Sequence, residues 1–329
     1  GKASVFYASG RFFSLFKVIS LLRMAAYDYD ALYLNSFFDF QFTALPLLIR
    51  QFGPSPKSPC IIAPRGEFSS GAISLKSRKK FLYLNLLKKI GIFRNLYWQA
   101  SSEFELSDIR QAMNVGTSSV LVAPDLPAPE ITAFEHIADT SLTAAVPPLR
   151  LIFLSRITPM KNLHFLLQCL SQVVENINFS IYGPLQDEVY WKRCQYLIAA
   201  LPQNISVEYR GEVIPSLVLK TLSQYDLFVL PTLGENYGHV VFESLSSGTP
   251  VLISDQTPWL SSSDSAVCSL SLDNPKRWAV AIDGYARLST NQRITLKKNA
   301  SNYSRDYRSR ANFVAKTREL FLTALQLKA

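Results

Sequence analysis

The chain has 329 residues, of which 48% are hydrophobic and 18% are charged. This composition excludes a disordered chain, and the length exceeds what one hydrophobic core usually serves, so we expect two domains. The formal net charge of +9 indicates an anionic partner such as a nucleotide, a nucleic acid, a phospholipid surface or an acidic saccharide.

The cysteines and the hydropathy pattern narrow the class of protein further. The four cysteines contain no C-x-x-C pair, so we expect reduced thiols in a cytoplasmic protein and no metal site. We find neither a secretory leader pattern nor an apolar span of 18 residues, and we therefore expect neither secretion nor membrane crossing.

In the first half of the chain, short apolar runs alternate with helical patterns. The pattern predicts strands at residues 3–8, 30–35, 60–63, 96–99 and 120–123. It predicts a helix at residues 13–24, a further helix between the second and third strands that ends at Ile49, and a helix at residues 102–113. Ser102 and Glu105 have the spacing of a capping box for the last helix. Alternating strands and helices predict a parallel sheet with helices on both faces.

A segment rich in proline, alanine and threonine, residues 124–149, is the expected linker, and the alternation restarts after it. The pattern predicts strands at residues 151–155, 178–182, 205–209, 227–230 and 251–254. It predicts helices at residues 162–175, 187–200, 214–223, from about 237 to 248, 275–288, 291–298 and 312–325. The sequence therefore predicts an α/β fold with two Rossmann-like domains.

Two loops of the second domain carry the charged residues of most interest. Arg156 and Lys161 follow one predicted strand, in a pattern suited to a diphosphate, although a solvated basic loop is the alternative. Glu235 and Glu243 follow another predicted strand and lie on either side of Gly238. The alternative to a ligand-binding role is that both are ordinary surface glutamates. Because the carboxyl ends of parallel strands meet at one edge of a sheet, we expect the two loops to lie together.

These motifs resemble a known family. The patterns S-R-x-x-x-x-K-N, Y-R-G-E-V, P-T-x-x-E-N-Y-G-x-x-x-x-E and G-T-P-V are similar to those of retaining glycosyltransferases of family 4 (glycosyl transferases group 1) with the GT-B fold. The resemblance implies an acceptor domain over residues 1–140 and a nucleotide-sugar donor domain over residues 141–304. It implies that the C-terminal helix, about 305–329, packs back on the first domain.

The resemblance also implies residue roles. Arg156 and Lys161 would bind the donor diphosphate, Glu235 would hydrogen-bond the donor sugar, and Glu243 would hold the ribose; we count Arg156, Lys161 and Glu235 as catalytic. The further donor-binding residues are Ser155, Gly183, Arg210, Gly211, Val213, Thr232, Asn236, Tyr237, Gly238, His239, Val240 and Glu243. Because fixed cations would stabilise the leaving phosphate, we expect no metal ion and no cofactor besides the nucleotide sugar.

The first domain should supply the acceptor side, where we single out Arg65, Gly66 and Glu67. Many relatives have a His-Gly pair where this chain has Arg65-Gly66, so a histidine-based role is not carried over. Glu67 has a second interpretation, a cap for the next segment. Residues 1–10 contain no glycine-rich loop of the kind with which the family usually begins, so we expect the domain to lack its first strands.

Residues 76–94 combine basic and apolar side chains, which favours contact with an anionic membrane surface over an ordinary core helix. We therefore expect a cytoplasmic, membrane-peripheral, bacterial enzyme of surface polysaccharide or lipopolysaccharide biosynthesis, with a UDP-sugar favoured over a GDP-sugar and a saccharide or lipid-linked acceptor. Two alternatives stay open: a nucleotide-sugar 2-epimerase of the same fold, and a non-enzymatic basic binding protein. No nucleic-acid module is recognised.

Overall fold

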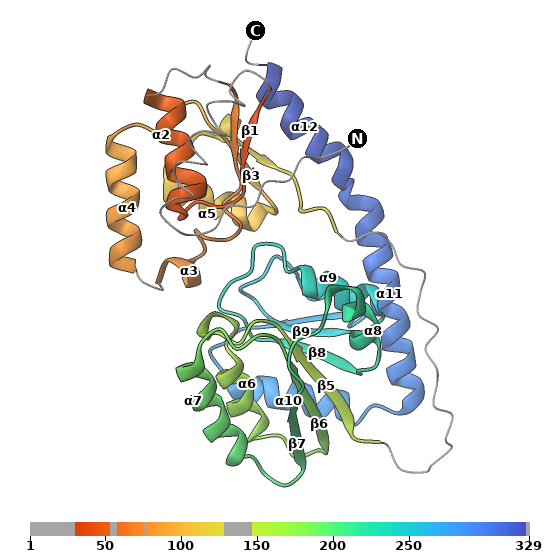
Figure 1. Cartoon of the computed structure of the whole chain (residues 1–329). Coiled ribbons are helices and arrows are strands. Elements are labelled where there is room, and N and C mark those ends of the chain that lie inside the picture. Colours follow the sequence, from red (N-terminus) through yellow and green to blue (C-terminus); the bar gives the residue numbers. More distant parts are fainter. Residues whose placement is uncertain (1–29, 53–57, 75–76, 128–146, 327–329) are drawn as a thin grey trace. The chain divides into compact units, whose positions relative to one another are not determined.

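The computed structural model describes residues 30–52, 58–74, 77–127 and 147–326. The chain divides into two compact units: residues 1–125 with Phe313–Ala329, and Leu126–Asn312 (Figure 1). Of the boundaries expected from the sequence, the one after residue 140 lies outside the described residues, and the one after residue 304 falls inside helix α11 (Thr290–Ala311). The elements predicted at 3–8 and 13–24, and with them the expected lack of first strands, also lie outside the described residues.

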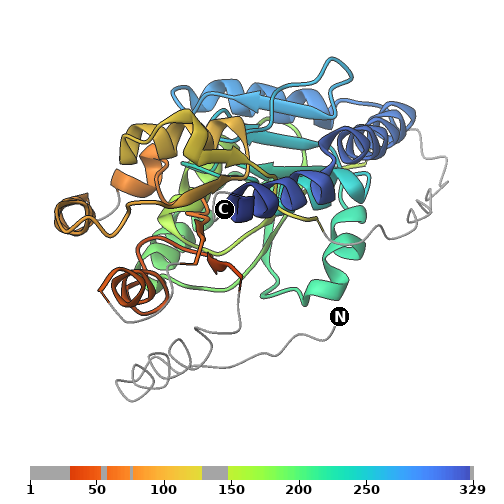
Figure 2. The ribbon, with the colours of Figure 1, turned by 90° about the horizontal axis from the view of Figure 1, so that it is seen from above.

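The first unit contains a parallel sheet of four strands in sequential order. The strands are β1 (Leu32–Leu34), β2 (Cys60–Ile62), β3 (Tyr97–Ala100) and β4 (Val120–Val122). The helices are a π-helical turn (Phe40–Ala44), α2 (Leu45–Phe52), α3 (Ser70–Ser74), α4 (Ser77–Lys89), α5 (Glu103–Met113), a 3-10 turn (Thr117–Ser119) and α12 (Phe313–Gln326). Figure 2 shows α2 and α4 nearly end-on.

The sheet of the first unit is buried on both faces, which explains why strand β2 is apolar throughout. Cys60 and Ile62 belong to a core that also holds Phe37 and Trp98. Ile61 points to the other face and packs with Leu320 and Ala324 of α12. The last helix of the chain therefore covers one face of the first sheet.

The capping box predicted for α5 is only half present. Ser102 accepts a hydrogen bond from the Glu105 backbone N–H at 3.2 Å, as an N-cap does. The Glu105 carboxylate, however, accepts from the backbone N–H of Ser101 at 2.8 Å and of Gly66 at 2.6 Å instead of returning to Ser102. The buried acid therefore joins the start of α5 to the turn after β2.

The second unit contains a six-stranded parallel sheet in the order β10-β9-β8-β5-β6-β7. The strands are β5 (Leu149–Leu154), β6 (Ile177–Tyr182), β7 (Ile205–Tyr209), β8 (Leu227–Leu230), β9 (Val251–Ser254) and β10 (Val267–Leu270). The helices are a 3-10 turn (Pro159–Lys161), α6 (Leu163–Leu170), α7 (Glu188–Ala199), a 3-10 turn (Pro215–Leu217), α8 (Val218–Ser223), α9 (His239–Ser246), α10 (Pro275–Ala286) and α11 (Thr290–Ala311).

The helices of the second unit form two groups with the sheet between them (Figure 1). Helix α6 packs with α7 and α10, whereas α9 packs with α8 and α11. Every residue of β8 and β9 is buried, which agrees with the continuous apolar runs that predicted them. The structure is thus the predicted α/β fold with two parallel-sheet units.

Three elements of the second unit differ from the prediction. Helix α6 ends at Leu170 rather than near residue 175, because the backbone N–H groups of Val174 and Glu175 donate to the Asp283 carboxylate instead of continuing the helix. Strand β10 was not predicted; it is short and only Val267 is buried in it. Helix α11 runs to Ala311 rather than to residue 298, although its second half has a polar composition.

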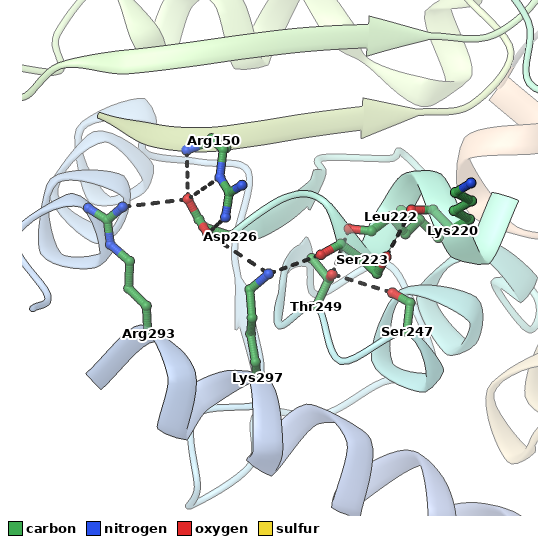
Figure 3. A network of polar contacts seen from close by, with 9 residues as sticks. All are labelled: Arg150, Lys220, Leu222, Ser223, Asp226, Ser247, Thr249, Arg293 and Lys297. Atoms are coloured by element: carbon green, nitrogen blue, oxygen red, sulfur yellow. Dashed lines mark hydrogen bonds and ion pairs between the residues drawn. The ribbon is translucent and has the colours of Figure 1, made fainter. Parts of the chain in front are cut away.

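Helix α11 is attached to the sheet by a charged cluster at the amino-terminal ends of β5 and β8 (Figure 3). The buried Asp226 carboxylate accepts from Arg150 Nη2 at 2.8 Å, and Arg293 Nη1 of α11 lies 3.5 Å from it. Lys297 Nζ lies 3.9 Å from the same carboxylate and donates to the Ser223 carbonyl at 3.1 Å. We refer to Arg150, Asp226, Arg293 and Lys297 as the Asp226 cluster.

Candidate functional site

The sheet order places a switch point between β5 and β8. From β5 the chain proceeds outward through β6 and β7, and β8 then starts the other half of the sheet beside β5. Loops from neighbouring strands that lead in opposite directions leave room for a ligand at the carboxyl edge of such a sheet. The loops with the predicted charged residues follow these two strands, Arg156 and Lys161 after β5 and Glu235 after β8.

Lys161 and Glu235 form an ion pair across the switch point. Lys161 is only 8% exposed, and the Glu235 side chain is also largely enclosed. Two contacts to the Met160 carbonyl support the pair: the Leu233 N–H donates to it at 2.8 Å, and the buried Thr232 hydroxyl, which also donates to the Gly234 carbonyl at 2.9 Å, lies 3.2 Å from it. The loop after β5 is therefore joined directly to the loop after β8.

A glycine makes the close approach of the β5 and β6 turns possible. A Cβ on Gly183 would lie 1.9 Å from the Ser155 carbonyl oxygen, and Gly183 has a φ of +132°. The Gly183 N–H donates to the Gly211 carbonyl at 2.8 Å, and the Tyr209 hydroxyl donates to the Gly183 carbonyl at 2.9 Å. Ser155, Gly183 and Gly211 therefore lie in one hydrogen-bonded set of turns at the carboxyl ends of β5, β6 and β7.

The loop after β8 turns sharply into α9. Gly238 is the N-cap residue of that helix, with a φ of +77°. A helix start presents backbone N–H groups and a positive dipole end, both suited to an anion, in the turn that holds His239 and Val240. The ring of buried Tyr237 lies 5.0 Å from that of His239, and the side chain of Asn236 is half-buried.

Glu243 is half-buried one turn into α9. Burial raises the pKa of its carboxyl above the ordinary value, while the neighbouring His239 acts in the opposite direction. The Glu243 carboxyl group is already partly desolvated. It can therefore form a hydrogen bond with a ligand hydroxyl group at little further cost in hydration.

Other predicted residues of this edge do not join the Lys161–Glu235 pair. Arg156 is exposed, and its Nη1 lies 3.5 Å from Gln186 Oε1. Arg210 forms an exposed ion pair with Glu208 at 2.5 Å, and Val213 is half-buried beyond it. The structure thus assembles Thr232, Lys161, Glu235, Tyr237 and Gly238 closely, with Arg156 and Arg210 further out.

The acceptor-side residues of the first unit lie in a polar network of their own. Arg65 has a φ of +56° and its guanidinium pairs with Asp125 and donates to the Tyr33 hydroxyl at 2.8 Å. The following Gly66 has a φ of +75°, so two successive residues adopt the left-handed region that side chains disfavour. Strained backbone of this kind is frequent at functional sites.

Glu67 has a partner that neither sequence interpretation foresaw. Its carboxylate accepts from the backbone N–H groups of Phe37 at 2.6 Å and Phe38 at 3.0 Å, and from the Ser36 hydroxyl at 3.1 Å. The predicted cap of the next segment is therefore wrong, because Glu67 binds the loop after β1. A contact of Glu67 with an acceptor stays a prediction.

Sequence reasoning missed two residues that support the two edges, Asp125 and Trp259, and it assigned Glu105 a capping role only. Asp125 and Glu105 bind the Arg65-Gly66 turn, and Trp259 binds the loop after β8. All three act through contacts between segments distant in sequence, for which no local pattern gives a signal. Among the described residues, no group of His, Cys, Asp and Glu has the arrangement of a metal site.

The family model described as glycosyl transferases group 1 matches residues 139–307, which are 169 of the 329 residues. The chain belongs to this family. The match covers the whole switch point, including Lys161, Glu235 and Glu243.

Solved structures of glycosyltransferases share the fold of this family member. Sucrose-phosphate synthase from Thermosynechococcus elongatus is 17% identical, with a TM-score of 0.74 over 98% of this chain and 82% of that chain. Anabaena HepE (Alr3699) in complex with UDP-glucose is 14% identical, with a TM-score of 0.69 over 93% of this chain and 81% of that chain.

WaaG, a glycosyltransferase involved in lipopolysaccharide biosynthesis, is 11% identical, with a TM-score of 0.64 over 97% of both chains. These similarities confirm the predicted GT-B fold class. No curated protein sequence matches the chain.

Proposed function

We propose that this glycosyltransferase moves a sugar with retention from a nucleotide sugar, with UDP preferred to GDP, to a saccharide or lipid-linked acceptor. The observation that carries the proposal is the Lys161–Glu235 ion pair at the switch point. A diphosphate bound by the Lys161 ammonium would have its sugar beside the Glu235 carboxylate, which can accept hydrogen bonds from sugar hydroxyls. The similarity to HepE with UDP-glucose and to WaaG supports a UDP-sugar and a role in bacterial surface polysaccharide or lipopolysaccharide biosynthesis.

The proposed chemistry needs positive charge where the nucleotide leaves. As the bond between the anomeric carbon and the phosphate oxygen breaks, the diphosphate gains negative charge, and fixed donors stabilise that charge in the transition state. Lys161 is held in place, the α9 start follows Gly238, and exposed Arg156 can approach from the outer side. This charge allows transfer without a metal ion, so EDTA should leave the activity unchanged.

We further propose that the acceptor hydroxyl attacks the face of the sugar from which the nucleotide leaves. Glu235 is engaged by Lys161, and we therefore assign it to sugar binding and not to nucleophilic attack. The leaving phosphate then accepts the proton of the incoming hydroxyl. A trapped covalent adduct between sugar and enzyme would contradict this mechanism.

Calorimetry with a panel of UDP- and GDP-sugars tests the donor assignment. We expect the wild type to bind a UDP-sugar, and Arg156→Ala and Lys161→Ala to weaken binding of the nucleoside diphosphate. Unchanged affinity in both variants contradicts the donor site, and release of a 2-epimer without an acceptor would instead support an epimerase.

For the first unit we propose peripheral contact with an anionic membrane through α4. Phe81, Leu82 and Leu86 are 71%, 70% and 58% exposed, and Ile90 and Lys89 continue the same face. Lys88 does not belong to it, because its Nζ donates to the Ala112 carbonyl at 2.6 Å. Among the described residues no helix is long and apolar enough to span a bilayer, so any contact of these helices would be at the surface.

Vesicle sedimentation tests the membrane contact. Replacing Leu82 and Leu86 by Asp should release the protein from vesicles that contain phosphatidylglycerol. Val189→Asp is the matched control, because Val189 is 80% exposed on α7 of the other unit. Equal release in both variants, or equal binding to neutral vesicles, would contradict the proposal.

A further inference from the structure

The loop that carries Glu235 is held from behind by the segment after β9, residues 256–259. The Glu235 N–H donates to the Gln256 carbonyl at 3.0 Å. Two residues further on, the Tyr237 carbonyl accepts from the indole N–H of Trp259 at 2.5 Å. The segment therefore holds the loop at two points, one on each side of Asn236.

Trp259 is also in contact with the turn that starts α9. A Cβ on Gly238 would lie 3.2 Å from Trp259 Nε1 and 3.2 Å from Glu235 Cγ. The indole and the Glu235 stem thus enclose the same glycine from two sides. A shift of Trp259 would change both the Glu235 side chain and the entry to α9.

The position of Trp259 is fixed by other aromatic rings. Trp259 is 3% exposed, and its ring lies 4.7 Å from that of Tyr307 and 6.4 Å from that of Tyr303, both on α11. Tyr237 and Phe242 pack on it from the α9 side, at 5.8 Å and 6.2 Å. The second half of α11 is polar in composition, so the sequence contains no sign of this packing. The contact face consists of two tyrosines one helical turn apart.

We propose that Trp259 is a positioning residue of the donor site, which sets the Glu235 carboxylate through the Tyr237 carbonyl. This inference rests on the proposed function. The diphosphate is assigned to Arg156 and Lys161, so loss of the indole hydrogen bond should affect sugar recognition more than nucleotide binding. Trp259 itself has no contact with the reacting atoms in this scheme.

Trp259→Phe removes the indole N–H and keeps an aromatic ring. Trp278→Phe is a matched control, because buried Trp278 of α10 also donates its indole N–H to a backbone carbonyl, that of Ser271 at 2.8 Å. The measured quantity is the ratio of the dissociation constants of UDP and of the UDP-sugar that the wild type binds in the panel of UDP-glucose and UDP-N-acetylglucosamine. We expect Trp259→Phe to lower this ratio about tenfold, with a similar loss in kcat, because small displacements in a site reduce activity steeply. We expect Trp278→Phe to leave this ratio and kcat unchanged, even where it lowers Tm as much as Trp259→Phe does.

If Trp259→Phe does not fold, Tyr307→Leu serves instead, since it removes the ring that packs closest to Trp259; a smaller decrease of the same ratio, about threefold, is expected. A wild-type ratio in the folded variant overturns the proposal. Failure of the wild type to bind any UDP- or GDP-sugar would overturn the proposed function itself, which is a distinguishable result.

Discussion

At each edge of the second sheet, a carboxylate is bound to basic residues. The two carboxylates differ in how many basic groups they contact. At the carboxyl edge, Glu235 is paired with Lys161. At the amino edge, Asp226 accepts from the Arg150 backbone N–H and guanidinium and lies beside Arg293 and Lys297 (Figure 3). The first arrangement can exchange a partner for a ligand, whereas the second holds α11 on the sheet.

The comparison teaches that an ion pair alone does not mark a functional site. The Asp226 cluster is the more extensive of the two, but it lies where β5 and β8 begin. Ligands of open α/β sheets bind where the strands end, because only there do loops from both halves of the sheet diverge. Location relative to strand direction thus decides the interpretation.

The largest expected effect separates the two lysines. Lys161→Met should lower kcat/KM about 10²- to 10³-fold, because one fixed charge at the leaving group is lost. Lys297→Met should leave kcat/KM unchanged. A sugar-transfer assay with each purified variant measures both, and equal losses would contradict the division of roles.

The two carboxylates should differ in the opposite sense for stability. Asp226→Asn leaves Arg293 and Lys297 buried without a countercharge and should cost about 3 kcal/mol of unfolding free energy. Glu235→Gln removes the countercharge from one enclosed lysine rather than from the three basic residues of the Asp226 cluster, so it should cost less unfolding free energy than Asp226→Asn. Urea unfolding gives both values; a stable Asp226→Asn protein would mean that the cluster is dispensable.

A smaller effect is expected from the glycine that joins the β5 and β6 turns. Gly183→Ala forces a Cβ against the Ser155 carbonyl oxygen, so the turn must move, and donor affinity should fall about tenfold. Gly284→Ala on α10, where a Cβ meets nothing within 4 Å, is the control and should stabilise by about 0.5–1 kcal/mol. Calorimetry and thermal unfolding distinguish the two.

A pH dependence of stability is expected from the buried Lys297. Burial lowers the pKa of Lys297 from 10.5 to about 8, against the attraction of Asp226. Between these two values the unfolded chain holds a proton that the folded chain has released, so the unfolding free energy should rise with pH, by at most about 1.4 kcal/mol per unit. Lys297→Met should lack this rise relative to the wild type; parallel profiles would contradict the assignment.

The parallel-sheet fold and the strands around the switch point follow from local patterns in the amino-acid sequence. β8 and β9 appear as apolar runs because they are buried on both faces; Pro231 ends the first run, and Gly248 and Pro250 precede the second. The loops with Lys161 and Glu235 were predicted to meet because strand direction alone sends both to one edge. Local patterns carry this information, since burial and turn geometry repeat at short spacing.

The residues that support these loops are set by contacts between distant segments of the chain. The end of α6 at Leu170 depends on Asp283, the length of α11 depends on Asp226 and on the aromatic contacts of Tyr303 and Tyr307, and Glu105 binds a turn 39 positions away. Trp259 gave no local signal because its partner, the Tyr237 carbonyl, is a backbone atom that every residue possesses. Contacts of this kind depend on packing between distant segments and leave no periodic trace in the chain.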